Sequence, residues 1–311
     1  MSYKTHSFAS LNAFSKLLLD YLAEKPALQG FYGNGARLAN FKEQISEKKG
    51  FPSSSRAILQ TVLAEQYAAI GAEMPSVDLR DENTFTVTTG HQLNIYTGPL
   101  YVIYKLVSTI NLARALQKAY PEQRFVPVYW MATEDHDFEE INHFFAFGTK
   151  YEWTTSQKGA VGRFHLSDFP RIPLRNAIFD KAYSEGKTLS EAVRIYMHAL
   201  FGAEGLVCLD ADDARLKSLF APIMEADLNQ QVHEPIVRAT TEKLEALGYK
   251  TQVAAREVNL FRLTENDRIR LEKGDQVEMA NASPNVILRP LYQEVILPNL
   301  AYIGGPAEVA Y

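Results

Sequence analysis

The chain has 311 residues, of which 46% are apolar and 22% are charged, a composition typical of a globular protein with one large core or two modest ones. Its 32 basic and 37 acidic residues leave a net charge of −5, which gives no electrostatic case for binding nucleic acid or an anionic membrane surface. We therefore expect a small-molecule partner.

No segment of the sequence resembles a targeting or membrane signal. The first residues, Met1 to His6, lack the long apolar stretch of a signal peptide, and no apolar run reaches the ~18 residues that span a bilayer. Cys208 is the one cysteine, which excludes an internal disulfide and a cysteine-based zinc site. The expected location is the cytoplasm.

Up to about residue 75 the apolar residues follow a helical spacing. One face collects Leu11, Phe14, Leu17, Leu18, Tyr21 and Leu22, and a second collects Ile58, Leu59, Val62, Leu63, Tyr67 and Ile70. Residues 31–35 are expected to form a turn, and the serines at 53–55 can supply the N-cap of the second helix. Residues 1–75 are therefore predicted to be a helical region packed on the core.

From Thr84 onward, the spacing of apolar residues predicts strands and helices in alternation. Residues 85–88 and 125–130 are predicted strands, and the helix between them is expected to begin at Gly98-Pro99 and to run over 100–119. Later predicted strands cover 206–209, followed by a helix to about Leu228, then 285–288 and 300–303. This alternation predicts an α/β fold with a doubly wound, mainly parallel sheet over residues 76–311 and a mixed insertion at about 148–200.

Two glycine-containing segments follow the first predicted strand, Gly90-His91-Gln92 and Thr97-Gly98-Pro99. Glycines let the backbone approach a ligand, and free N–H groups at a helix start favour a phosphate or carboxylate. Ordinary packing at a helix start explains the pattern equally well. It is neither a Walker loop nor a dinucleotide fingerprint. Tyr101 and Lys105 share a helix face, so Lys105 either points to the same site or is solvated.

Four ionisable residues follow the second predicted strand, Glu134-Asp135-His136-Asp137. Such crowding shifts pKa values, which favours Asp135 or His136 as a general acid or base. A helix from Phe138 would also bring together His136, Glu140 and His143, the ligands that a metal-dependent hydrolase would need. The structural alternative is an N-cap formed by Asp135 or Asp137.

Near the end of the chain, Gly304-Gly305-Pro306-Ala307-Glu308 again combines glycines with a helix start and a carboxylate, and is expected to form a third wall of the site. Arg289 is expected to follow a strand, where it would bind a carboxylate bidentately or form a surface ion pair. Cys208 lies in an apolar strand and is predicted to be a buried, inert thiol.

Five ordered blocks of sequence carry a specific resemblance. They are Thr88-Thr89-Gly90-His91-Gln92; Thr97-Gly98-Pro99-Leu100-Tyr101 with Lys105; Glu134 to Phe138 with Ile141-Asn142-His143; Ser283-Pro284-Asn285 with Leu288-Arg289-Pro290; and Ile303 to Glu308. Together they resemble the cysteine ligase family of bacillithiol biosynthesis. The resemblance implies a Rossmann-like core, similar to nucleotidyl-transferase and class I aminoacyl-tRNA synthetase domains, and the addition of L-cysteine to glucosaminyl malate as the last step of that pathway. The family's C-terminal coiled coil, which implies a dimer, is absent here, so the oligomeric state stays open.

The resemblance also suggests roles for individual residues. Asp135 or His136 would deprotonate the incoming amine, Arg289 would pair with a carboxylate, and His91, often glutamine in the family, would bind. The full set of expected binding residues is Thr89, Gly90, His91, Gln92, Thr97, Gly98, Tyr101, Lys105, Asp137, His143, Arg289, Gly304, Gly305 and Glu308. ATP with magnesium is the hypothesised activator of the carboxylate, and no tightly bound metal is expected. The alternatives are the hydrolase using His136, Glu140 and His143, and a fragment that binds a sugar or nucleotide without catalysis.

Overall fold

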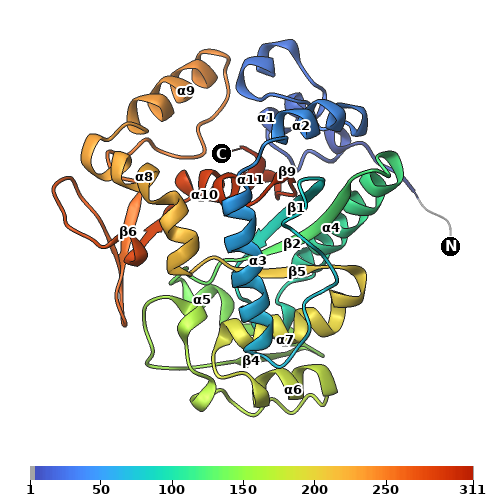
Figure 1. Ribbon diagram of the computed structural model, residues 1–311, viewed down its shortest axis with the longest axis vertical. Helices are drawn as coiled ribbons and strands as arrows, with labels where there is room; N and C mark the ends of the chain where they lie inside the picture. Colours follow the sequence, from blue (N-terminus) through green and yellow to red (C-terminus); the bar gives the residue numbers. More distant parts are fainter. Residues whose placement is uncertain (1–3, 311) are drawn as a thin grey trace.

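The computed structural model describes residues 4–310 and has a parallel sheet at its centre (Figure 1). Four strands lie in the order β5-β2-β1-β9, and every neighbouring pair is parallel. Their bounds are β1 (Thr84–His91), β2 (Arg124–Met131), β5 (Val207–Asp210) and β9 (Asn299–Tyr302). The predicted α/β fold with a mainly parallel sheet is confirmed.

Strands β1 and β2 are buried on both faces, as parallel strands covered by helices must be. β1 nevertheless alternates threonine with apolar residues. The buried hydroxyls of Thr86 and Thr88 both lie within hydrogen-bonding distance of Oδ1 of Asn299 on β9, at 3.3 and 2.8 Å. This pairing satisfies polar groups that would otherwise be costly to bury, and it fixes β9 at the edge of the sheet.

Helices cover both faces of the sheet, which makes the fold doubly wound. One face packs against α3 (Ser53–Ala68), α8 (Ala214–Gln230) and α10 (Leu288–Ile296), and the other against α4 (Leu100–Ala119) and α7 (Leu189–Phe201). Side chains of β2 alternate accordingly, because successive strand residues point to opposite faces. Val128 and Trp130 join the first cluster, and Tyr129 and Met131 join the second. In Figure 1, α3 lies across the sheet toward the viewer.

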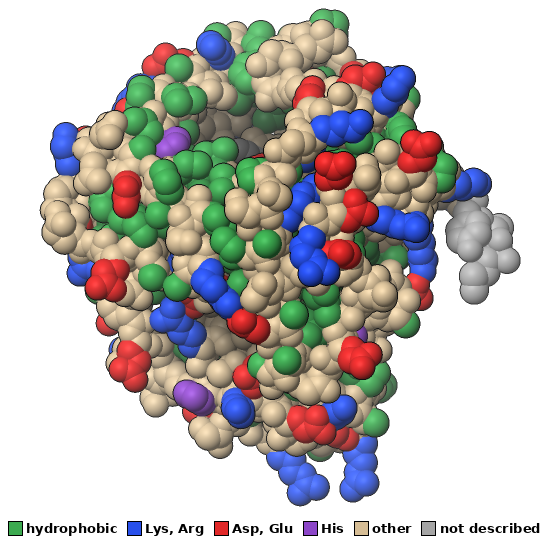
Figure 2. Space-filling view, viewed as in Figure 1, with side chains coloured by type: hydrophobic (Ala, Val, Ile, Leu, Met, Phe, Trp, Pro, Cys, Tyr) green, Lys and Arg blue, Asp and Glu red, His purple; other side chains and the backbone are tan. Residues whose placement is uncertain are grey.

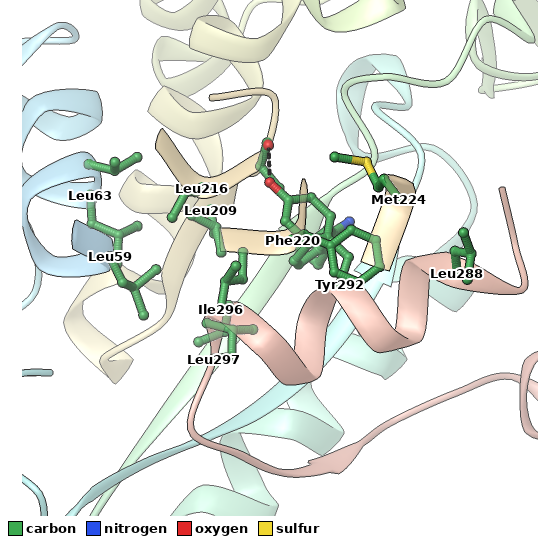
Figure 3. Close-up of a cluster of buried hydrophobic side chains, with 14 of the residues drawn as sticks. Leu59, Leu63, Leu209, Leu216, Phe220, Met224, Leu288, Tyr292, Ile296 and Leu297 are labelled. Carbon is green, nitrogen blue, oxygen red and sulfur yellow. Dashed lines mark hydrogen bonds between the residues drawn. The ribbon is translucent and has the colours of Figure 1, made fainter. Parts of the chain in front are cut away.

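Figure 3 shows the first of these clusters, in which side chains of α8 and α10 pack against each other. The rings of Phe220 and Tyr292 are stacked with centroids 5.0 Å apart. The buried Tyr292 hydroxyl donates a hydrogen bond of 2.8 Å to the carbonyl of Ala211. Since Ala211 directly follows β5, this bond ties α10 to the carboxyl end of the sheet, where side chains of the cavity are positioned.

The N-terminal region is helical, as predicted, although its first helix is shorter than the apolar spacing suggested. Helix α1 (Lys16–Leu22) begins after Ser15, whose hydroxyl accepts a hydrogen bond from the N–H of Leu18 at 3.2 Å. Helix α2 (Phe41–Lys48) packs against β9, and its Phe41 contributes to a cluster with Phe85 of β1. Helix α3 begins at Ser53 without the serine side-chain cap that the sequence suggested.

The segment after β2 forms a small mixed layer beside the sheet. It contains the single turn α5 (Phe138–Ile141), the hairpin β3 (His143–Ala146) and β4 (Thr149–Glu152), and helix α6 (Ala177–Glu185). Trp153 is completely buried here, with its indole N–H donating to Asp168 at 3.0 Å. It packs with the residues of β2 and α4 that form the second cluster. The boundaries proposed for this insertion and for the domains stay a prediction.

A three-stranded antiparallel sheet follows α8 and α9 (Glu234–Ala246) in the chain. It has the order β7-β6-β8, with β6 (Leu260–Leu263), β7 (Arg268–Arg270) and β8 (Ala282–Pro284). The strand predicted at 285–288 is wrong, because Asn285 turns the chain: its Oδ1 accepts from the N–H groups of Ile287 and Leu288 at 2.8 and 3.2 Å. Helix α10 begins there, and the chain then passes through β9 to α11 (Pro306–Ala310).

The surface seen in Figure 2 carries acidic and basic side chains interspersed, and it is hollowed between α9 and the N-terminal helices. Among the helices that the structure describes, each is too short or too polar to cross a bilayer.

Candidate functional site

A cavity of about 590 Å³ lies where strands β1 and β2 end. The parallel register sets His91 beside Met131 and Met131 beside Asp210, so the loops that follow β1, β2 and β5 begin at the same edge. The antiparallel sheet and the start of α10 close the other sides. Charged or hydrogen-bonding side chains on its wall are His91, Gln92, Thr133, Glu134, Asp135, His136, Asp137, Gln252, Arg256, Arg268, Arg270, Ser283, Asn285, Arg289, Tyr302 and Glu308.

Residues predicted from separate parts of the sequence therefore meet in one place. Those that line the cavity are Gly90, His91, Gln92, Asp135, His136, Asp137, Arg289 and Glu308. Arg289 reaches the wall from the first turn of α10, and not from a strand end as the sequence suggested. Glu308 reaches it from α11, because β9 pairs with β1 and brings the end of the chain to the same edge.

Other predicted residues lie behind this wall and shape it. The hydroxyl of Thr89 donates to the carbonyl of Ile303 at 2.8 Å. The Lys105 side chain is 5% exposed, and its ammonium donates to the carbonyl of Gly90 at 2.5 Å. Tyr101, Gly304 and Gly305 lie around the same point, where a side chain on Gly305 would collide with the Tyr101 hydroxyl.

Glu308 is held by a converging set of donors. Its carboxylate oxygens accept from Lys105 at 2.6 Å, from the N–H of Gly305 at 2.7 Å and from the hydroxyl of Tyr302 at 2.7 Å. The Tyr302 hydroxyl in turn accepts from the N–H of Gly90 at 3.1 Å. Burial disfavours the charged form of Glu308, but these donors outweigh it and hold its pKa below the ordinary value. Burial lowers the pKa of Lys105, and the contact with Glu308 opposes that shift.

Thr97 and Gly98 lie in a strained loop between β1 and α4, outside the cavity wall. Tyr96, Thr97 and Gly98 all have positive φ values, of 51°, 70° and 61°. The loop is held by the hydroxyl of Tyr183, which accepts from the N–H of Tyr96 at 2.9 Å. A Cβ on Gly98 would overlap the side chain of Asn94, so glycine is required here by both conformation and space. The loop sets where α4 begins.

His91 is half-buried beside the cavity. Burial, together with the nearby Lys105 charge, lowers the pKa of its imidazole. Its ring lies edge-on to Tyr101, with centroids 5.9 Å apart. A neutral imidazole in this position is suited to hydrogen bonding.

The acidic end of β2 forms a tight turn. Oδ1 of Asp135 accepts from the N–H of His136 at 2.7 Å, and Oδ2 accepts from the amide of Gln92 at 2.9 Å. The His136 ring has Nδ1 3.6 Å from Asp135 and Nε2 3.8 Å from Asp137. Asp137 occupies the N-cap position of α5, but its side chain caps no N–H group. The carboxylate of Asp135 thus orients the backbone while remaining on the cavity wall.

The helix that the hydrolase prediction requires is too short in the structure. Helix α5 ends at Ile141 and His143 begins β3, so the helical face that would bring His136, Glu140 and His143 together does not form. Nδ1 of His143 lies 2.9 Å from Oδ1 of Asn142, and Glu140 accepts from Gln92. In residues 4–310 the group of side chains able to share one cation is Asp135, His136 and Asp137.

Beneath the cavity lies a buried ionic cluster that the sequence did not reveal. The side chain of Lys217 is 1% exposed, and its ammonium lies 2.7 Å from both Glu134 and Asp212. Arg163 also pairs with Asp212, in two hydrogen bonds of 2.7 and 3.0 Å. Burial raises the pKa of Glu134, whereas Lys217 and Arg163 overcome burial and lower that of Asp212. Asp212 follows a strand, which was a usable signal, but nothing local marks Lys217 as its partner.

Three further arginines on the wall were also missed, namely Arg256, Arg268 and Arg270. Arg268 and Arg270 are two residues apart on β7 and share a face of that strand. This alternation was the available signal, but the sequence alone does not show that β7 lies beside the end of β2.

Comparison with known proteins assigns the chain to a family. Residues 1–282 and 276–311 match the family model described as "Bacillithiol biosynthesis BshC, N-terminal Rossmann-like domain". Relatives from Flavobacterium psychrophilum and Flavobacterium johnsoniae, both named "Putative cysteine ligase BshC", are 45% and 42% identical to it. The alignments cover 98% and 100% of this chain but 65% of each relative, so the chain spans about two thirds of their length. The chain belongs to the BshC family of bacillithiol biosynthesis and corresponds to its Rossmann-like N-terminal domain.

Proposed function

We propose that this chain provides the substrate-binding core of a ligase that adds L-cysteine to glucosaminyl malate in the last step of bacillithiol biosynthesis. The names of the relatives support the reaction class. The observation that carries the proposal for this chain is that one cavity holds a carboxylate and a histidine, Asp135 and His136, beside an arginine that can bind an anion, Arg289. Such a site can hold a carboxylate and accept a proton.

Joining a carboxylate to an amine is uphill in water, so the reacting carboxylate must be activated. ATP with magnesium, when bound, would supply a phosphate or nucleotide leaving group on that carboxylate. The cavity wall suits such an anionic group, since Arg268 has a buried Nε without an acceptor and lies beside Arg270. No residue of this chain needs to form a covalent bond with substrate in this scheme.

The residues of the chain would then position the substrates and deprotonate the attacking amine. Arg289 would pair with a carboxylate, and the backbone at Gly90, fixed by Lys105, would border the reacting groups. Asp135 or His136 would take the proton that the amine loses as it attacks the carbonyl carbon. A positioned base of this kind contributes roughly 10²- to 10⁴-fold to the rate.

The test is an incubation of the purified chain, and in parallel the full-length Flavobacterium psychrophilum relative, with cysteine and glucosaminyl malate. Product is measured by mass spectrometry with and without ATP and magnesium. We expect product only with the nucleotide, and Asp135→Asn should lower turnover more than Glu139→Gln, a change on the exposed first turn of α5. Equal product without nucleotide would reject activation by ATP. Binding of glucosaminyl malate without turnover in either protein would favour a binding function.

A further inference from the structure

The three arginines of the cavity wall approach it from one side. Arg268 and Arg270 lie on β7, and Arg256 lies in the segment between α9 and β6. We call these three residues the arginine group. None of them was expected from the sequence to bind substrate.

Phe261 of β6 contacts two members of the arginine group, Arg268 and Arg270. The guanidinium of Arg268 lies 4.0 Å from the centroid of the Phe261 ring, and that of Arg270 lies 4.8 Å from it. The His136 ring lies 6.3 Å from the same ring. Stacking on a shared aromatic ring orders the two guanidinium groups, and it places them next to the candidate base at the end of β2.

In the described part of the chain, carboxylates lie near Arg268 but none forms an ion pair with the arginine group. Within residues 4–310, Arg256, Arg268 and Arg270 form no ion pair with a carboxylate, whereas Arg163 and Arg215 both do. Arg268 donates only to neutral oxygens, Oγ of Ser283 and the carbonyl of Pro284, both at 3.2 Å. Its Nε is buried and has no acceptor. The guanidinium of Arg268 is therefore poorly compensated, because a buried donor without a partner is costly.

The carboxylates of Glu134, Asp135 and Asp137 lie near Arg268, and the first two are engaged elsewhere. Glu134 pairs with Lys217, and Asp135 accepts from Gln92 and from the backbone of its own turn. Burial lowers the pKa of Arg268, and burial with repulsion from Arg256 lowers that of Arg270. The neighbouring carboxylates oppose the shift at Arg268 but do not overcome burial, so an additional anion would further stabilise the positive charge.

We propose that the arginine group is an oxyanion-binding subsite of the cavity, which takes the carboxylates of a dicarboxylic acid or the phosphates of a nucleotide. Planar guanidinium groups bind both kinds of anion through paired N–H donors. The subsite deepens the proposed function and rests on it for the identity of the substrate, since either a malyl group or an activating nucleotide carries this chemistry. Arg270 is the more exposed of the two stacked arginines and can contact a ligand without rearrangement of the strand.

Calorimetric titration with L-malate and with inorganic pyrophosphate tests the subsite directly. We expect Arg270→Gln to weaken binding of one of the two anions by about tenfold or more, the loss that follows from removing a charged hydrogen bond. Arg262→Gln is the matched control, because Arg262 lies in the same small sheet, donates to the carbonyl of Gln276 and does not line this cavity. Arg268→Lys keeps the buried charge and should weaken binding by losing the paired donors.

Loss of malate binding would identify a dicarboxylate subsite, and loss of pyrophosphate binding would identify a phosphate subsite. The proposal is overturned if both arginine variants bind the two anions as tightly as the Arg262→Gln control does. It is also overturned if the unaltered chain binds neither anion. Thermal melting of each variant shows whether it is folded. Binding is measured without turnover, so the two proposals can fail separately. If the anions bind and binding depends on the arginines, but no ligation occurs, only the proposed function is rejected.

Discussion

Lys105 on α4 and Glu308 on α11 form an ion pair of 2.6 Å although they are 203 positions apart in the chain. The pair also holds the end of β1, because Lys105 donates to the carbonyl of Gly90. One buried ammonium group behind the wall thereby connects α4 with two segments of the cavity wall, the end of β1 and α11.

Replacement of Glu308 by glutamine should destabilise the protein by about 3–5 kcal/mol, because it leaves the Lys105 ammonium buried without a counter-charge. Urea unfolding followed by circular dichroism measures this change. A double variant with Lys105→Met and Glu308→Gln removes both charges and should recover part of the loss. A single variant as stable as the unaltered chain would show that the pair contributes nothing.

The same pair predicts how stability depends on pH. The pKa of Glu308 is lower in the folded chain than in the unfolded chain, so its contribution is present above the ordinary carboxyl value of 4.5 and is lost as pH falls through the lowered value. The difference in unfolding free energy between the unaltered chain and Glu308→Gln should therefore be constant near neutral pH and shrink in acid. A difference that grows on acidification would contradict this assignment.

Lys217 should be far more sensitive to substitution than an arginine on the same helix. Lys217→Met leaves the buried Glu134 without its cation and leaves Asp212 paired with Arg163 alone, and it should cost about 3–5 kcal/mol. Arg215 forms ion pairs of its own at the surface, and Arg215→Met should cost about 0–1 kcal/mol. Chemical denaturation of the two variants compares them, and equal losses would argue against a structural role for the buried cluster.

Gly98→Ala should destabilise the loop before α4 more than Gly148→Ala destabilises the β3–β4 hairpin. Both glycines have positive φ, so either alanine costs about 1–2 kcal/mol from backbone strain. Only at Gly98 does the new Cβ also meet a side chain, that of Asn94, while Gly148 faces open space. Thermal unfolding measures the difference, and a smaller loss at Gly98 would show that the loop readily adopts another conformation.

Cys208 should be unreactive in the folded protein. Its side chain is completely buried in β5, and burial raises the pKa of the thiol to about 12. Iodoacetamide at pH 8 should therefore label the cysteine only after denaturant is added, which mass spectrometry detects. Rapid labelling without denaturant would mean that β5 at the edge of the sheet opens frequently.

The sequence predicted the sheet and its helices where local signals and tertiary packing agree. Helix α4 has the bounds expected, Leu100–Ala119, because Gly98-Pro99 marks its start and Pro121 follows its end. The run at 285–288 was misassigned, since a short apolar segment fits a strand and a buried helix start equally well. There the side chain of Asn285 decided the structure.

Residues of the cavity wall at the ends of β1 and β2 could be predicted from the sequence because polar groups directly follow apolar strands. The partners of those residues could not. Lys217 pairs with Glu134, and the arginines of β7 share the cavity wall with His136. In both cases the partners are more than 80 residues apart in the chain, so only tertiary packing brings them together. Pairing of this kind depends on the completed topology, which no local pattern encodes.

The position of β9 in the sheet determines when the sheet can be completed during synthesis. Strand β1 is hydrogen-bonded to β9 from Thr86 to Thr88, with partners from Asn299 to Tyr302. During synthesis, the hydrogen-bonding groups of β1 that face β9 therefore stay unpaired until more than 200 further residues have left the ribosome. An uncovered parallel edge is prone to pair with other chains, and contacts this distant form slowly. A chain truncated before Asn299 should consequently aggregate more readily than the unaltered chain.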